Sequence, residues 1–223
     1  VISEIAMEKR FNIVNNDVEK YIQDTLAPLR DNLQVMYRNA LKNGVPVVRL
    51  EVLRVLETYL ILKKPYSLLE LGTATGFTSI FFSEYLKDNG YIDTVENDLE
   101  MVKRARENIK EMAPDKDINV IYAEACDYLK NIHKKYDIIF IDAAKGHYEE
   151  YFDICSNLVN ENGIIFSDNV LYRGMVAKGD KIPHRQKTLV ERLHRYLDKI
   201  TKDERFCTSI LSVGDGLSVS VKK

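Results

Sequence analysis

Strand-like and helix-like patterns alternate along most of the 223 residues. Short apolar runs such as 67–71 and 137–141 have the length and composition of strands buried on both faces. Longer segments between them repeat apolar residues every three or four positions, as amphipathic helices do. This alternation predicts an α/β fold with a parallel sheet and helices on both faces. The expected strands are 67–71, 91–95, 118–122, 137–141 and 163–167, and the helices between them are 77–89, 99–112, 126–133 and 148–159.

The N-terminal part of the chain is helical throughout in this interpretation. Apolar residues at helical spacing over 17–43 are interrupted by Pro28, which predicts two helices. A third helix is expected over 50–62, because the following Pro65 disfavours continuation. We therefore expect residues 1–62 to form a helical cap that precedes the first strand.

The C-terminal part adds a helix and two extended runs. The helix is expected over 188–201, and Gly214-Asp-Gly216 is typical of a hairpin between strands 207–213 and 217–222. No repeat, low-complexity segment or long linker divides the chain. The prediction is one domain over 1–223, with a doubly wound, Rossmann-like core of seven strands over 66–223 whose last strand is antiparallel.

Composition sets few limits on partners. The 32 Lys and Arg against 34 Asp and Glu give a net charge of −2, so composition neither requires nor excludes a nucleic acid. Three widely spaced cysteines, Cys126, Cys155 and Cys207, favour buried thiols in a reducing compartment over a redox or metal role.

Membrane insertion is not expected. No apolar stretch approaches the ~20 residues that a spanning helix needs. Glu4, Glu8, Lys9 and Arg10 stand where a secretory signal would be apolar. The expected location is the cytoplasm.

Oxygen ligands follow two of the predicted strands. Asp142 comes directly after the run 136–141, and Asp168 and Asn169 come directly after 163–167. Because parallel strands end at one edge of the sheet, these side chains should meet there, and their hard oxygen donors suit Mg²⁺. The alternative is that both aspartates cap the helices that follow. We favour the metal because Asn169 adds a third ligand.

A glycine-containing loop follows the first strand. Gly72 and Gly76 precede a helix, which is how a doubly wound sheet opens a nucleotide pocket. The spacing is not that of pyrophosphate binding, and the acidic Glu70 suits a cationic aminoacyl tail better than a diphosphate. Glu96 ends the second strand, where an acid can accept hydrogen bonds from both ribose hydroxyls. These features favour S-adenosylmethionine over NAD.

Together these motifs resemble a known family. Glu70-Leu-Gly-Thr-Ala-Thr-Gly76, Glu96, Asp142-Ala-Ala-Lys145 with Tyr148, and Asp168-Asn169 resemble the Mg²⁺-dependent class I S-adenosylmethionine O-methyltransferases, which include catechol and caffeoyl-CoA O-methyltransferases. The resemblance spans about 17–223. Segments 140–148, 168–177 and 213–223 most resemble the bacterial tRNA 5-hydroxyuridine methyltransferases.

The resemblance implies roles for further residues. It assigns Lys145 as general base, and the sequence alone also allows a cation that stabilises an oxyanion or a solvated surface lysine. Relatives are commonly dimers, so the N-terminal helices could supply a homodimer contact. The plant enzymes usually have Asp at 144, where this chain has Ala, and relatives tend to have Gly-Asp-Ala where it has Ala123-Glu-Ala125. The implied cofactor contacts are Val48, Glu70, Gly72, Thr73, Gly76, Thr78, Glu96, Glu124, Ala125 and Asp142.

The substrate is less constrained than the chemistry. A metal can hold two adjacent oxygens, which catechols and 5-hydroxyuridine both offer. The basic segment 172–187 could hold the phosphates of a tRNA anticodon loop, with Tyr172 available for stacking and Arg173 and Arg185 for phosphate contacts. A solvated loop is the alternative. Small vicinal-oxygen substrates, or a non-catalytic S-adenosylmethionine-binding module, remain open. The other cations of the segment are Lys178, Lys181 and Lys187.

Overall fold

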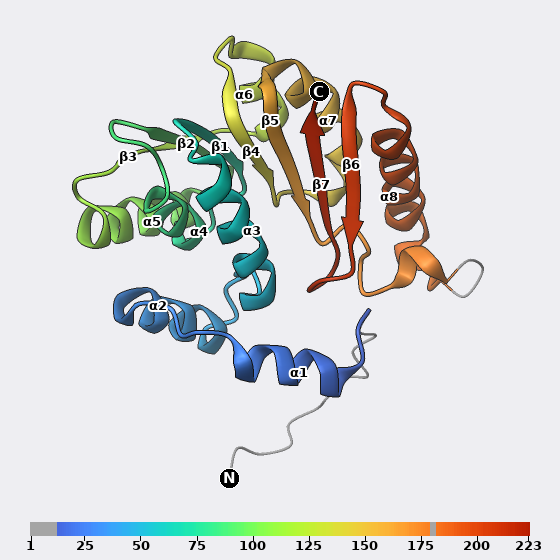
Figure 1. The fold of residues 1–223 in the computed structure, drawn as a ribbon, viewed down its shortest axis with the longest axis horizontal. Coiled ribbons are helices and arrows are strands. Elements are labelled where there is room, and N and C mark those ends of the chain that lie inside the picture. Colours follow the sequence, from blue (N-terminus) through green and yellow to red (C-terminus); the bar gives the residue numbers. More distant parts are fainter. Residues whose placement is uncertain (1–12, 179–181) are drawn as a thin grey trace.

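A seven-stranded sheet forms the centre of the molecule (Figure 1). The structure is a computed structural model, and it describes residues 13–178 and 182–223. The strand order is β3-β2-β1-β4-β5-β7-β6, and β7 runs antiparallel to both of its neighbours. The predicted fold class is therefore confirmed. The strands are β1 (Ser67–Leu71), β2 (Tyr91–Glu96), β3 (Asp117–Tyr122), β4 (Tyr136–Ile141), β5 (Val159–Asp168), β6 (Phe206–Leu211) and β7 (Leu217–Lys222).

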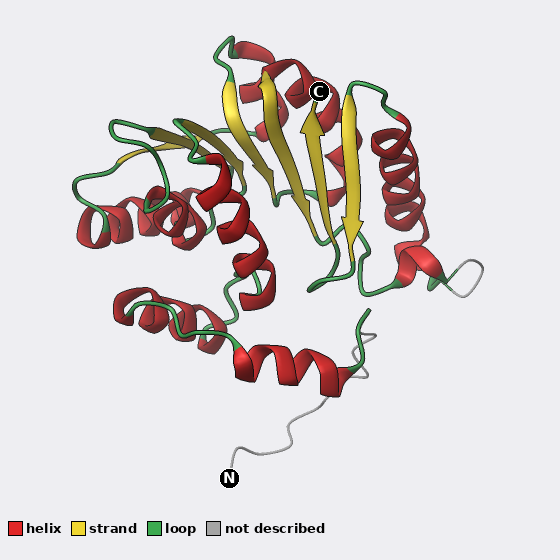
Figure 2. Cartoon of the chain, viewed as in Figure 1, coloured by secondary structure: helices red, strands yellow, loops and turns green. Residues whose placement is uncertain are grey.

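Helices cover both faces of the sheet (Figure 2). Leu68, Phe140 and Phe166 face a core shared with α2 to α5, and the alternate positions Leu69 and Ile139 face a core shared with α6 to α8. Because both faces are covered, the central strands are apolar at successive positions. The helices are α2 (Asp31–Lys42), α3 (Leu50–Lys63), α4 (Phe77–Ser83), α5 (Leu99–Met112), α6 (Ala125–Asn131), α7 (Tyr148–Leu158) and α8 (His184–Lys202).

The first helix, α1 (Asn16–Thr25), lies across the carboxyl ends of the parallel strands (Figure 1). It has no buried residue. Polar contacts with the start of α3 hold it, since Glu19 pairs with Arg49 and Gln23 Nε2 donates to Glu51 Oε2 at 3.2 Å. The two helices predicted on either side of Pro28 are thus present, and the first contributes to the rim of the sheet's carboxyl edge.

Two helix boundaries differ from the prediction by four residues or more. Helix α4 ends at Ser83 instead of residue 89, because the chain returns to the sheet and Lys87 N–H donates to the Pro65 carbonyl at 2.9 Å. Helix α8 begins at His184, four residues earlier than expected, and Pro183 is its N-cap residue.

The described residues contain no helix that is both long and apolar enough to cross a bilayer. Glu4, Glu8, Lys9 and Arg10, which argued against a signal segment, lie outside the described residues.

Candidate functional site

A cavity of ≈ 1240 Å³ opens at the carboxyl edge of the parallel strands. The strand order reverses between β1 and β4, so the loops that follow these strands diverge and leave a crevice there. Its volume exceeds the range typical of ligand pockets, about 300–1,000 Å³. Most of the predicted site residues line it: Val48, Gly72, Thr73, Thr78, Glu96, Glu124, Ala125, Asp142, Lys145, Asp168, Asn169 and Arg173.

Four predicted site residues do not line the cavity: Glu70, Gly76, Tyr172 and Arg185. Gly76 caps α4 with φ of 82° and approaches Ala105 of α5. Tyr172 is half-buried in the loop after β5, and Arg185 is exposed on the first turn of α8. Any contact of the last two with a ligand would therefore occur outside the cavity.

Gly72 is required for a reason that the sequence did not reveal. A Cβ at this position would lie 2.1 Å from the Asp142 carbonyl oxygen, and φ is 100°. The interpretation that the glycine admits a ligand is thus incomplete. Gly72 also lets the loop after β1 pack against the loop that carries Asp142, and this packing brings the two halves of the cavity together.

Glu70 is fully buried beneath the cavity. Its Oε2 accepts hydrogen bonds from the Ser79 and Thr94 hydroxyls, the latter at 2.7 Å, and Thr94 in turn contacts the Thr73 hydroxyl at 2.6 Å. Its Oε1 has no partner among the described residues. Burial raises the pKa of Glu70 to about 8. The chain of hydroxyls thus links the cavity lining to a carboxyl that is predominantly protonated at neutral pH.

Glu96 holds the loop after β1 in place. Its Oε2 accepts from Ala74 N–H at 2.8 Å, and its Oε1 accepts from the N–H groups of Asn97 and Asp98, both at 2.9 Å. A carboxylate has about four acceptor positions, so three backbone bonds leave one for a ribose hydroxyl. From the sequence, both ribose hydroxyls were expected to bind there.

Asp142 and Asp168 lie close together in the cavity, at the carboxyl ends of two neighbouring strands. Asp142 follows β4, and Asp168, which is 2 % exposed, ends β5. Burial raises the pKa of both carboxyls, the charge of Asp142 raises that of Asp168 further, and Lys145 opposes both effects. Two such carboxyls beside one lysine are poorly compensated, and a divalent cation would remedy this. The donor set of two carboxylates and the Asn169 amide fits Mg²⁺.

The loop after β5 has an unusual backbone. Asn169, Tyr172 and Arg173 all have positive φ, at 57°, 44° and 55°. The turn of the β6–β7 hairpin holds this loop, since Val170 N–H donates to the Gly216 carbonyl at 3.0 Å and Arg173 N–H donates to the Asp215 carboxylate. The hairpin therefore fixes the conformation that presents Asn169 to the cavity.

Several cavity residues were not predicted from the sequence. Asp215 lines the cavity, and its charge contributes to the raised pKa of Asp168. The only signal was an acidic residue between two glycines, which we interpreted as a turn alone. Arg49 and Glu19, together with Gln23, also line the cavity. They were missed because α1 and α3 were expected to form a separate cap.

The cysteines are less uniform than predicted. Cys155 is buried and Cys126 is half-buried, but Cys207 is exposed on the edge strand β6, so the expectation of three buried thiols was wrong. On β6 the Phe206 side chain is buried, and the side chain of the next residue, Cys207, points to the opposite face of the sheet, where it is exposed. All three cysteines are free thiols.

The basic segment lies partly on a helix instead of a loop. Arg173 is exposed and lines the cavity, while Arg185 and Lys187 are exposed on the first turn of α8, which has no acidic residue. Cations at a helix N-terminus are electrostatically unfavourable, so an anion bound nearby would be stabilising. Lys181, which was expected to contribute, and Asp180 lie outside the described residues.

Comparisons with known proteins agree with the fold and the motifs. A model of the O-methyltransferase family matches residues 20–223. A candidate caffeoyl-CoA O-methyltransferase of Arabidopsis thaliana is 31% identical over 155 residues, 68% of this chain and 67% of that protein. The catechol O-methyltransferase of Niastella koreensis is 29% identical over 171 residues, 74% of this chain and 77% of that protein. The crystal structure of a candidate caffeoyl-CoA O-methyltransferase from Staphylococcus aureus matches with a TM-score of 0.85 at 28% identity, covering 93% of this chain and 100% of that one.

Proposed function

The chain belongs to the O-methyltransferase family, and we propose that it methylates 5-hydroxyuridine at the wobble position of tRNA to 5-methoxyuridine with the help of Mg²⁺. It is an S-adenosylmethionine-dependent O-methyltransferase. The grouping of Asp142, Asp168, Asn169 and Lys145 on one cavity supports the metal-assisted chemistry. The exposed cations Arg173, Arg185 and Lys187 support the choice of tRNA. The acceptor and the metal are the proposed parts.

The cofactor would occupy the half of the cavity next to β1 and β2. S-adenosylmethionine supplies an electrophilic methyl group. Glu96 offers its remaining acceptor position to the ribose, and Glu124 and Ala125 border the adenine side. The loop after β1 positions Thr73 over the buried Thr94 and Glu70. These residues bind and orient the cofactor so that its methyl group points toward the Asp142 side.

The acceptor oxygen would lie between Lys145 and the oxygen ligands. Mg²⁺, held by Asp142, Asp168 and Asn169, would supply Lewis acidity that lowers the pKa of an acceptor hydroxyl. Lys145 Nζ would take the hydroxyl proton or stabilise the negative charge that develops on the oxygen. Asp215 would hold the loop after β5 so that Asn169 keeps its position. This arrangement suits a substrate with two neighbouring oxygens.

The distribution of charge supports an RNA acceptor held at the rim. Acidic residues outnumber basic ones in the cavity lining, so phosphates would be repelled from its interior. Arg173, Arg185 and Lys187 lie outside or at its edge, where an anticodon loop could place phosphates while one base enters. Tyr172 would have to move from its half-buried position to stack on a neighbouring base.

A small catechol-like or caffeoyl-CoA-like acceptor is the second candidate. The relative from Niastella koreensis is named as a catechol O-methyltransferase, and the one from Arabidopsis thaliana as a candidate caffeoyl-CoA O-methyltransferase. The same ligands and lysine would serve it, because the chemistry requires only adjacent oxygens. Such an acceptor would not need the basic rim, and this distinguishes it from the RNA substrate.

We also propose that the protein forms a homodimer through its N-terminal helices. Three apolar side chains of α1 support this: Val18, Tyr21 and Ile22 are 48%, 70% and 39% exposed. Light scattering after gel filtration would test it, with Tyr21→Glu expected to shift a dimer toward monomer. An unchanged mass in that variant would place the contact elsewhere.

Mass spectrometry of nucleosides tests the function directly. The protein would be incubated with S-adenosylmethionine, Mg²⁺ and tRNA that carries 5-hydroxyuridine, with and without a chelator, and in parallel with a small catechol. Conversion to 5-methoxyuridine that the chelator abolishes is the expected result. Methylation of the catechol with none of the tRNA would overturn the RNA substrate and keep the metal-assisted chemistry. Full activity with chelator present would overturn the metal.

A further inference from the structure

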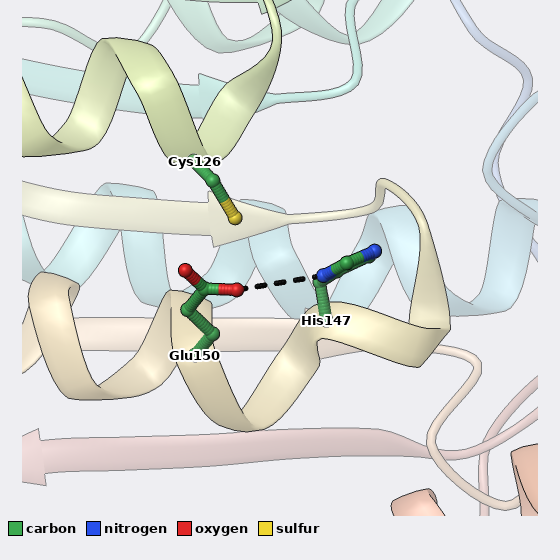
Figure 3. A group of neighbouring side chains, drawn as sticks. All are labelled: Cys126, His147 and Glu150. Carbon is green, nitrogen blue, oxygen red and sulfur yellow. Dashed lines mark ion pairs between the residues drawn. The ribbon is translucent and has the colours of Figure 1, made fainter.

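A second group of possible metal ligands lies at the rim of the cavity. Cys126 is on α6, His147 ends the short 3₁₀ turn Lys145–His147, and Glu150 is on the first turn of α7. Their ligand atoms all lie within 4.8 Å of one another. Figure 3 shows the thiol, the imidazole and the carboxylate turned toward a common centre. Within 13–178 and 182–223, no other three His, Cys, Asp or Glu side chains are so grouped.

The geometry is close to that of a bound ion. Zinc binds sulfur at about 2.3 Å and nitrogen or oxygen at about 2.0–2.2 Å in a tetrahedral arrangement, so two ligand atoms of one ion lie about 3.4–3.6 Å apart. Small side-chain rotations would bring the three atoms into that range. His147 and Glu150 are three residues apart on one helical turn, which places both on the same face. His147 Nδ1 is already 3.5 Å from Glu150 Oε2.

The donor set selects a different ion from the one proposed for the oxygen site. One sulfur, one nitrogen and one oxygen suit Zn²⁺, whereas Mg²⁺ prefers oxygen ligands alone. We propose that Cys126, His147 and Glu150 form a Zn²⁺ site. Binding replaces the thiol S–H bond with a sulfur–zinc bond and releases one proton to solvent, so it needs no oxidant or reductant.

A bound metal would replace some of the existing contacts of these residues. Burial and the neighbouring Glu150 raise the pKa of the Cys126 thiol to about 11, and a cation bound between them would favour the thiolate. Glu150 pairs with Lys130 at 2.9 Å, but both side chains are about half exposed, and such surface pairs contribute little. The His147 ring lies 5.9 Å from that of Tyr151, which leaves its nitrogens accessible at the edge. Cys126 and His147 line the cavity while Glu150 does not. The fourth coordination position would therefore face the cavity, beside the adenine side of the cofactor site.

Cobalt provides a direct spectroscopic test. Co²⁺ would be titrated into the full chain in the presence of excess Mg²⁺, which would occupy the proposed oxygen site. A thiolate-to-cobalt charge-transfer band that saturates at one equivalent is expected. Cys126→Ser should abolish the band, and the matched control Cys207→Ser, which changes the exposed thiol on β6, should retain it. No band in the unmodified chain, or a band that survives Cys126→Ser, would overturn the site.

Calorimetry with Zn²⁺ identifies the other two ligands. His147→Ala and Glu150→Gln should each weaken Zn²⁺ binding at least roughly tenfold, the loss that even outer-shell partners of a metal cause. Asp168→Asn should leave it unchanged, which separates this site from the proposed Mg²⁺ site. Circular dichroism would confirm that each variant is folded. Unweakened binding in both His147→Ala and Glu150→Gln, or its loss in Asp168→Asn, would contradict the assignment.

Discussion

The cavity has two groups of potential ligands that differ in burial and in chemistry. Asp142 follows β4 and Asp168 ends the neighbouring strand β5, and both are largely shielded from solvent. His147 and Glu150 lie on an accessible helical turn and face Cys126. The first group has hard oxygen donors with raised pKa values. The second mixes sulfur, nitrogen and oxygen. A shielded pair of carboxylates is unfavourable without a cation, while the rim cluster is satisfied by its own contacts.

This contrast implies different dependences on metal. The oxygen group needs a cation to relieve its electrostatics, so its stability and its chemistry should change together when the metal is removed. The rim cluster should gain or lose a metal with little effect on the fold. Substitutions and titrations can separate the two groups, and the largest effect is expected at the oxygen site.

Asp168→Asn should reduce methyl transfer by roughly 10²–10³-fold, the loss typical of removing one group that stabilises developing charge. The variant keeps the size of the side chain but removes the charge that is proposed to bind Mg²⁺. Initial rates over a range of Mg²⁺ concentrations would measure it. Glu150 does not line the cavity, so Glu150→Gln should methylate its substrate at the rate of the unmodified chain. Equal losses in both variants would mean that the two groups form one functional unit.

Lys145→Met should lower turnover by about 10²-fold or more, since general acid–base catalysis commonly contributes 10²–10⁴-fold. The affinity for S-adenosylmethionine should stay nearly constant, because the lysine is assigned to the acceptor side. Single-turnover rates and equilibrium dialysis would measure the two quantities. Lys103→Met, on the exposed face of α5, is the matched control. An unaffected turnover would remove Lys145 from the mechanism.

The pH dependence of stability should come from the buried carboxyls. Burial raises the pKa of Glu70 from 4.5 to about 8, so between these values the unfolded chain ionises while the folded protein keeps its proton. The free energy of unfolding should therefore decrease as pH rises through this window. Urea titrations at several pH values in this window would measure the free energy of unfolding. For Glu70→Gln it should depend less steeply on pH than for the unmodified chain.

The free energy of unfolding of Glu70→Gln should still decrease as pH rises, because Asp142 and Asp168 also have raised pKa values. Mg²⁺ should reduce this remaining slope, since it favours the ionised carboxylates. Zn²⁺ at the rim should not reduce it when Mg²⁺ is already present. A steeper slope in Glu70→Gln would contradict the assignment of Glu70 as a protonated group.

The smallest effect is expected at the basic rim. Arg173→Ala or Arg185→Ala should weaken tRNA binding and reduce the salt slope of log K by about 1 for each phosphate that the variant no longer neutralises. Fluorescence binding assays at several salt concentrations would measure both. Lys202→Gln, at the opposite end of α8, is the control. An unchanged slope in both arginine variants would leave the proposed phosphate binding without support.

Local patterns were sufficient where burial alone determines structure. Helix α5 and strand β1 have the predicted boundaries, because their apolar spacing matches the surfaces that they bury. The boundary of α4 was wrong, because a long-range hydrogen bond from Lys87 to Pro65 ends it. The role predicted for Gly72 was incomplete for a similar reason, because the Asp142 carbonyl, which packs against it, is 70 positions away in sequence.

The pattern of residues was enough to predict the doubly wound sheet and the meeting of Asp142 with Asp168, because strands that alternate with helices end at a common edge. It also indicated the cofactor loop through Glu70, Gly72 and Glu96. Only the tertiary structure placed Asp215 against the loop after β5 and Cys126 beside His147 and Glu150. These contacts depend on how a hairpin and two helices pack across the chain, and packing geometry leaves no periodic signal in the residues that it brings together.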